Sequence, residues 1–166
     1  LHCYTDSESK KYGGELSKEE GFALLDDLAA FGVPSVLLSG GEPFVHPHLF
    51  DYITCAREKG LRVTISTNGT MISKERAARL NEIGVSYVGI SLDGIGATND
   101  TFRGKIGAFN EAVEGIRNCL SAGVRVGLRM TLTRHNVEDL PGIFRFIREE
   151  KIPRVCFYHL APAGRG

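Results

Sequence analysis

Three short segments rich in glycine and polar side chains, residues 39–42, 66–69 and 91–94, each follow an apolar run of the chain. Glycine allows a backbone to approach a ligand closely, and the carboxylate of Glu42 can pair with an ammonium group. Each segment taken alone also fits a simple turn capped by a short polar side chain. Their recurrence after successive apolar runs predicts one binding site built from several loops.

The apolar runs have the length and composition of β-strands, and amphipathic segments lie between them. The strand candidates are residues 35–39, 61–66, 86–92, 124–132 and 154–158. This repeated alternation predicts five βα units.

Five helices are predicted in the amphipathic segments. The first has Ser17 and Glu20 at capping-box spacing. Its apolar face is predicted to comprise Leu24, Leu25, Leu28 and Phe31. The second and third span residues 48–59 and 73–83, with a glycine directly after each. The fourth and fifth lie around residues 109–120 and 141–147.

Alternating helices and nearly continuous apolar strands indicate an α/β fold with a parallel sheet covered by helices. Both a doubly wound sheet and a (βα) barrel fit this pattern. Polar segments at several successive strand ends favour the barrel, because its active site collects residues from the carboxyl ends of many strands. We therefore predict a partial (βα) barrel of the TIM-barrel-like type, with parallel strands in sequence order and helices on the outside.

The composition of the chain narrows the classes of partner. It has 166 residues, with 20 Lys and Arg against 20 Asp and Glu, so its formal net charge is zero and nothing points to nucleic acid or to an anionic membrane. No apolar run approaches the roughly 18 residues of a membrane span. We expect a single cytoplasmic domain with a small-molecule partner. The four cysteines form no CxxC pair, and Cys55, Cys119 and Cys156 are predicted to be ordinary buried thiols.

Residues 1–4, Leu-His-Cys-Tyr, are followed one βα unit later by residues 39–44, Ser-Gly-Gly-Glu-Pro-Phe, and together they resemble the signature of the radical S-adenosylmethionine (SAM) superfamily. In that family a CxxxCxxC loop holds a 4Fe-4S cluster. The resemblance therefore implies that Cys3 is a metal ligand and that the other two cysteines precede Leu1. It also implies that SAM binds the cluster and yields a 5'-deoxyadenosyl radical, which no protein side chain supplies unaided.

The resemblance further implies a set of SAM-binding residues at the strand ends. Glu42 would pair with the ammonium group of SAM. Arg103, from a loop, and Arg129, from within a strand, would face its carboxylate. Tyr4 and Leu160 would flank its adenine. The full implied set is Tyr4, Gly40, Gly41, Glu42, Pro43, Ser66, Asn68, Ser91, Asp93, Arg103, Arg129 and Leu160.

Most of these residues also have a simpler structural interpretation. Turn capping is the alternative for Asp93 and Thr67, ion pairing within the fold is the alternative for the two arginines, and core packing is the alternative for Tyr4 and Leu160. The combination of motifs, and no single residue, indicates the family.

Residues 99–104, 107–109 and 156–166 are most similar to radical SAM enzymes of the siroheme-dependent heme pathway. This similarity implies a tetrapyrrole substrate, hydrogen abstraction next to an acetate or propionate arm, fragmentation of that arm, and an electron donor such as ferredoxin or flavodoxin. Two alternatives stay open. One is a peptide-modifying radical SAM maturase with a C-terminal auxiliary-cluster domain. The other is a cluster-free barrel that binds a phosphorylated metabolite through its glycine loops.

Residues 1–166 are expected to form a radical SAM core domain truncated on the N-terminal side of the cluster loop and lacking the C-terminal region. Cys3 alone cannot hold a cubane cluster, so we expect the chain by itself to be inactive. The other three cysteines are predicted to lie in helices or within a strand, and none would reach the cluster.

Overall fold

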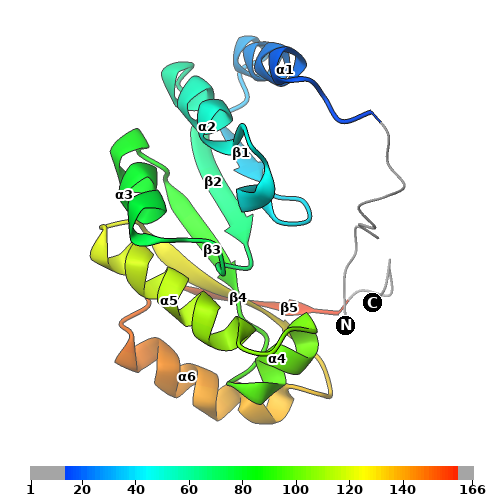
Figure 1. Cartoon of the computed structure of the whole chain (residues 1–166), viewed down its shortest axis with the longest axis vertical. Coiled ribbons are helices and arrows are strands. Elements are labelled where there is room, and N and C mark those ends of the chain that lie inside the picture. The colour runs from blue at the N-terminus through cyan, green and yellow to red at the C-terminus, as the bar shows by residue number, and fades with distance from the viewer. Residues whose placement is uncertain (1–13, 161–166) are drawn as a thin grey trace.

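The computed structural model describes residues 14–160, and a five-stranded parallel sheet forms its centre (Figure 1). The strands are β1 (Ser35–Leu38), β2 (Arg62–Thr67), β3 (Tyr87–Ser91), β4 (Val126–Leu132) and β5 (Val155–His159). Their bounds differ from the predicted ranges by at most two residues. The prediction of five parallel strands is confirmed.

Six α-helices occur between residues 14 and 160, together with two short 3-10 helices. They are α1 (Lys18–Ala30), η1 (Pro43–Val45), α2 (Leu49–Glu58), α3 (Lys74–Ile83), α4 (Ala97–Arg103), α5 (Ala108–Ser121), η2 (Val137–Asp139) and α6 (Leu140–Glu149). Five of the α-helices were predicted, whereas α4 was not, because its seven residues are mostly polar and show no apolar periodicity. Arg103, predicted to lie in a loop, is instead the last residue of α4.

The order of the strands in the sheet is their order in the sequence, from β1 to β5. A doubly wound sheet would instead reverse its strand order at a switch point. Helices α2, α3, α5 and α6 lie on one side of the sheet, and the strands rotate progressively from β1 to β5 (Figure 1). The predicted partial (βα) barrel is therefore confirmed.

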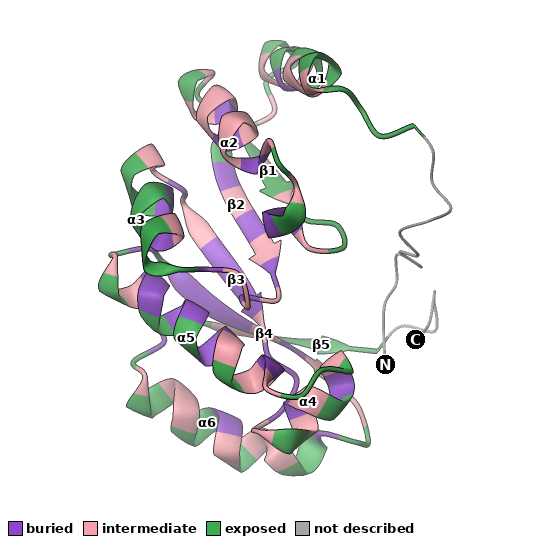
Figure 2. Cartoon of the chain, in the orientation of Figure 1, coloured by how far each residue is buried: buried purple, intermediate pink, exposed green. Residues whose placement is uncertain are grey.

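The two faces of the sheet differ in burial (Figure 2). Successive side chains of a strand point to opposite faces, so alternate positions share an environment. The face toward the helices carries side chains with no more than 1% of their surface exposed, among them Val63, Ile65, Val88, Ile90 and Leu128. The opposite face, here called the inner face, carries partly exposed side chains, among them Ser66, Tyr87, Ser91, Arg129 and Thr131. The inner face is therefore the polar one.

The capping box predicted at the start of α1 is formed, but its predicted apolar face is wrong in part. Leu25 is buried, whereas Leu24 is 47% exposed and Phe31 is 88% exposed. The reason is that, within residues 14–160, α1 packs mainly on α2, where the rings of Phe22 and Tyr52 lie 5.5 Å apart. A helix with one neighbour buries a narrower stripe than the sequence pattern suggests.

Within the described part of the chain, no helix has both the length and the apolar character needed to span a membrane.

Candidate functional site

Glu42 lies directly after the glycine pair at the end of β1, and its carboxylate joins this segment to the end of β2. One oxygen accepts hydrogen bonds from the Thr67 hydroxyl at 2.7 Å and from the backbone N–H of Phe44 at 3.1 Å. The other oxygen accepts from the backbone N–H of Asn68 at 2.8 Å. These three bonds hold the carboxylate at the carboxyl ends of the strands, partly buried.

Thr67 has no freedom to turn its hydroxyl elsewhere. The hydroxyl oxygen accepts a hydrogen bond from the backbone N–H of Gly69 at 3.0 Å, so its single hydrogen is directed to Glu42. Thr67 is 3% exposed, which keeps water from competing for these bonds. The threonine therefore acts as a fixed link between the loop after β2 and the Glu42 carboxylate.

The loop after β2 is supported from behind by α5. Gly69 has a φ of +80°, a conformation that favours glycine. Its carbonyl oxygen lies so close to Gly115 of α5 that a side chain at position 115 would overlap it. One turn further along α5, the Asn118 amide donates to the carbonyl of Ile72 at 2.9 Å. Asn68 is thus presented at the strand end by a loop with little room to move.

Asp93 follows β3 and is 1% exposed, and its carboxylate is bound by the fold itself. One oxygen accepts from the backbone N–H of Thr131 at 2.8 Å, and the other pairs with the Arg103 guanidinium. The Asn136 amide donates to the carbonyls of Asp93 and Thr131 at 2.9 and 2.8 Å. This geometry favours the structural interpretation of Asp93, as the group that ties α4 and the end of β4 to the end of β3.

Arg129 lies on the inner face of β4, in register with Ser91 of β3 and Cys156 of β5. Its guanidinium carbon is 5.0 Å from the centre of the Tyr158 ring, a cation–π contact. Among residues 14–160, no carboxylate pairs with Arg129. Arg129 and Arg103 thus differ, because Arg103 already has Asp93 as its partner.

The other predicted residues lie as follows. Gly40 has a φ of +141°. Apart from the adjoining residues, no atom of residues 14–160 lies within 4 Å of a Cβ built at Gly40 or Gly41, so the described part of the fold leaves the backbone there open to an approaching group. Pro43 is buried, whereas Leu160 is 44% exposed directly after β5. Ser66 and Ser91 are partly exposed on the inner face. Cys3 and Tyr4 lie outside the described residues.

The remaining cysteines lie in the elements that the sequence predicted, but the prediction that all three are buried is wrong for Cys55 and Cys156, which are partly exposed. Cys55 lies in α2, Cys119 is buried in α5, and Cys156 lies within β5. Burial raises the pKa of the Cys119 thiol to about 12, so it is neutral and unreactive at ordinary pH. Among residues 14–160, no group of three or more His, Cys, Asp or Glu side chains is arranged to hold a metal ion.

Two residues that complete the strand-end network were not predicted. Thr131 and Asn136 are separated from Asp93 by 38 and 43 positions in the chain. No local sequence signal marks them, because their role depends on the neighbouring strand and on the turn after it.

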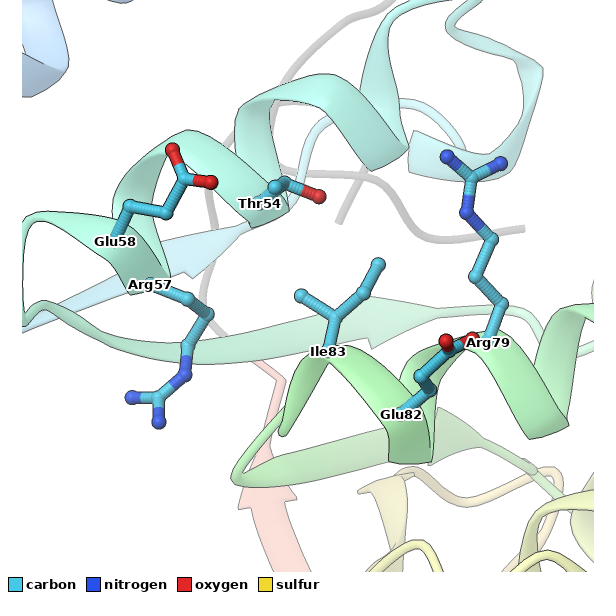
Figure 3. A pocket seen from close by; sticks show the side chains of 6 residues that line it. All are labelled: Thr54, Arg57, Glu58, Arg79, Glu82 and Ile83. Atoms are coloured by element: carbon cyan, nitrogen blue, oxygen red, sulfur yellow. The ribbon is translucent and has the colours of Figure 1, made fainter.

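A separate hollow of about 350 Å³ lies between α2 and α3, on the outer side of the sheet (Figure 3). Its lining is Thr54, Arg57, Glu58, Arg79, Glu82 and Ile83. It lies away from the strand ends and contains no predicted site residue.

The strand-end geometry suits an amino-acid ligand of the SAM type. Glu42 supplies a carboxylate directly after the open backbone of Gly40 and Gly41, and partly exposed hydroxyl and amide groups lie on the neighbouring strand ends. A carboxylate binds an ammonium group, and hydroxyl and amide groups bind carboxylate and ribose oxygens. The residues present therefore fit such a ligand.

Comparisons with known proteins place this geometry in a family. A profile described as the radical SAM superfamily matches residues 1–147. The chain is 55% identical over its whole length to Fe-coproporphyrin III synthase of Methanosarcina barkeri, of which it covers 42%. It is 44% identical over 99% of its length to pre-heme d1 synthase of Dinoroseobacter shibae, of which it covers 41%.

The fold also matches the solved structure of native anSMEcpe with bound AdoMet, with a TM-score of 0.80 at 19% identity. That match covers 96% of this chain and 47% of the other. The chain thus spans less than half the length of these proteins. Radical SAM enzymes use a 4Fe-4S cluster and SAM, and the strand-end residues described here fit the SAM part of that requirement. The match over residues 1–147 shows that the chain belongs to the radical SAM superfamily.

Proposed function

We propose that this chain is the core of an enzyme that removes or remodels carboxylate arms of a tetrapyrrole by radical SAM chemistry. The observation that carries the proposal is the 55% identity, over all 166 residues, to a protein named Fe-coproporphyrin III synthase. The 44% identity to a protein named pre-heme d1 synthase supports the same substrate class.

In the proposed enzyme, the strand ends bind SAM. The Glu42 carboxylate, already oriented by Thr67 and the Asn68 N–H, accepts the ammonium group of the methionine part. The open backbone at Gly40 and Gly41 allows that group to approach. Ser66, Asn68 and Ser91, at the ends of the next two strands, supply hydrogen bonds to the carboxylate and ribose.

Further residues bind the rest of the cofactor. Cys3 is a ligand of the cluster, which together with SAM supplies the 5'-deoxyadenosyl radical when bound. Tyr4 and Leu160 flank the adenine. Arg103, positioned by its ion pair with the buried Asp93, faces the SAM carboxylate. These roles are carried by the family resemblance and by the positions of the described residues at the strand ends.

The substrate and the electron donor complete the proposal. The radical would abstract a hydrogen next to an acetate or propionate arm, and that arm would then fragment. Ferredoxin or flavodoxin would supply the electron, and the protein would act in the cytoplasm.

The test is an anaerobic assay of the full-length protein reconstituted with iron and sulfide. Supplied with SAM, a reductant and an iron tetrapyrrole that bears acetate and propionate arms, it should form 5'-deoxyadenosine together with a tetrapyrrole reduced in mass by the lost arm. Formation of 5'-deoxyadenosine with modification of a peptide instead would support the maturase alternative. Phosphate-ligand binding without any 5'-deoxyadenosine would support the cluster-free barrel.

A further inference from the structure

A group of five side chains lies on the inner face and extends from near the strand ends down the sheet. We call it the inner-face cluster, and its members are Tyr87, Arg129, Arg154, Cys156 and Tyr158. The guanidinium of Arg129 lies 5.0 Å from the Tyr158 ring, and that of Arg154 lies 5.5 Å from the Tyr87 ring. The cluster therefore extends over three neighbouring strands, β3, β4 and β5.

Two glycines make room for this cluster. Gly89 and Gly127 are neighbours in register on β3 and β4. A Cβ at Gly89 would lie 2.7 Å from Cδ of Arg129, and a Cβ at Gly127 would overlap the hydroxyl of Tyr87. Because neither glycine has a side chain, Arg129 and Tyr87 can lie along the sheet surface in fixed positions.

The charge of the cluster is not neutralised by the described part of the protein. It holds two guanidinium groups, and no carboxylate is among the groups that act electrostatically on Tyr87. Two arginines elsewhere have acidic partners, since Arg103 pairs with Asp93 and Arg117 pairs with Glu150. Neither guanidinium has a carboxylate partner among residues 14–160, although the exposed Arg154 also interacts with the Cys156 side chain. Two such groups on one face attract an anion, and their planar donors match a carboxylate.

An unsatisfied hydroxyl supports the same conclusion. The phenol oxygen of Tyr87 is buried and has no hydrogen-bond partner within residues 14–160. Burial raises the pKa of this phenol, so it is a neutral donor. A buried donor without a partner is unfavourable, and a bound acceptor, direct or through water, would relieve it.

We propose that Arg129, held in place by the Tyr158 ring, binds a carboxylate arm of the substrate. This inference rests on the proposed function, since a tetrapyrrole of that class carries acetate or propionate arms. The carboxylate of SAM is the other available anion, but it shares one carbon with the ammonium group assigned to Glu42. Glu42 is bound to the end of β2, whereas the backbone of Arg129 lies in β4, two strands further along the sheet. At the usual spacing of strands, the β2 and β4 backbones are about 10 Å apart.

The test uses the full-length holoenzyme and two probes, coproporphyrin III and its tetramethyl ester, which has the same ring but no free carboxylate. Arg129→Gln should weaken binding of the free acid by about 10- to 100-fold, the range for loss of a charged hydrogen bond. It should leave binding of the ester and of SAM within about twofold of wild type. Arg129→Lys should lose part of the affinity for the acid, because lysine keeps the charge without the planar fork.

Arg148→Gln is the matched control, since it removes one exposed positive charge from α6, on the other side of the sheet. It should leave the affinity for the acid unchanged, and all variants should unfold at the wild-type temperature to within a few degrees. Unchanged binding of the acid by Arg129→Gln would overturn the inference and leave the proposed function standing. A selective loss of SAM affinity would do the same, because it would assign Arg129 to the cofactor. If the wild-type protein bound neither probe, the proposed function would fail and the inference with it.

Discussion

Replacing Thr67 with valine removes the hydroxyl that links Glu42 to the loop after β2 and keeps the shape of the side chain. Thr67 is 3% exposed, and its hydroxyl donates to Glu42 at 2.7 Å while accepting from Gly69 at 3.0 Å. The valine therefore loses one hydrogen bond to a carboxylate and leaves one buried N–H without a partner. We expect lower stability and weaker SAM binding from this one change.

The size of the effect follows from these two bonds. A hydrogen bond to a charged group contributes about 1.5 to 3 kcal/mol, and a buried donor left unpaired costs about 1 to 3 kcal/mol. The two effects share one hydroxyl and are not additive, so we expect the free energy of unfolding to fall by about 2 to 4 kcal/mol. Glu42 keeps its bonds from Phe44 and Asn68, but with more freedom to rotate, so SAM affinity should fall about tenfold.

Thr67→Ser is the matched control because it keeps the hydroxyl and removes one buried methyl group, at a cost of about 1 kcal/mol. Urea unfolding of the full-length apoprotein measures stability, and equilibrium titration of the reconstituted protein measures SAM affinity. The serine variant should bind SAM within about twofold of wild type. The reasoning would be refuted if the valine variant matched wild type in both assays, or if serine cost as much as valine.

Three further predictions concern other parts of the fold. Glu42→Ala should weaken SAM binding by about 1.5 to 3 kcal/mol, the contribution of a charge-assisted hydrogen bond, and equal affinity by calorimetric titration would remove Glu42 from the site. Gly115→Ala should destabilise the protein by about 1 to 3 kcal/mol in urea unfolding, because its methyl group overlaps the Gly69 carbonyl, and wild-type stability would show that the loop can move aside. Cys119 should resist iodoacetamide in the native protein at pH 8 and react only after unfolding, since burial raises its pKa to about 12. Because the thiol ionises more readily in the unfolded chain, its contribution to stability should be intact below about pH 9 and should fall as the pH rises from there toward 12, a decline that Cys119→Ala should lack.

Local patterns in the sequence predicted most of the regular structure. All five strands and five of the six described α-helices were found from apolar runs, a capping box and terminal glycines, because these depend on residues within a few positions of one another. The order of the strands followed from the polar segments at successive strand ends. Helix α4 was missed because its seven residues are mostly polar and show no apolar periodicity. The exposed residues of α1 were misjudged because the pattern does not reveal how many neighbours a helix has.

The candidate site divides in the same way. The types and spacing of residues at positions 1–4, 39–44 and 67–69 were enough to indicate the family and Glu42 as a cofactor ligand. Two of the three bonds that orient Glu42 come from residues 25 and 26 positions later, and those that bind Asp93 come from residues 10 and 38 positions later. Only the arrangement of β3, β4 and β5 in the sheet showed that Arg103 has a carboxylate partner and that Arg129 has none among residues 14–160. A sequence determines which groups can donate, accept or carry charge, whereas the tertiary fold decides which of them meet, because closing the chain over long separations depends on the packing of the whole sheet.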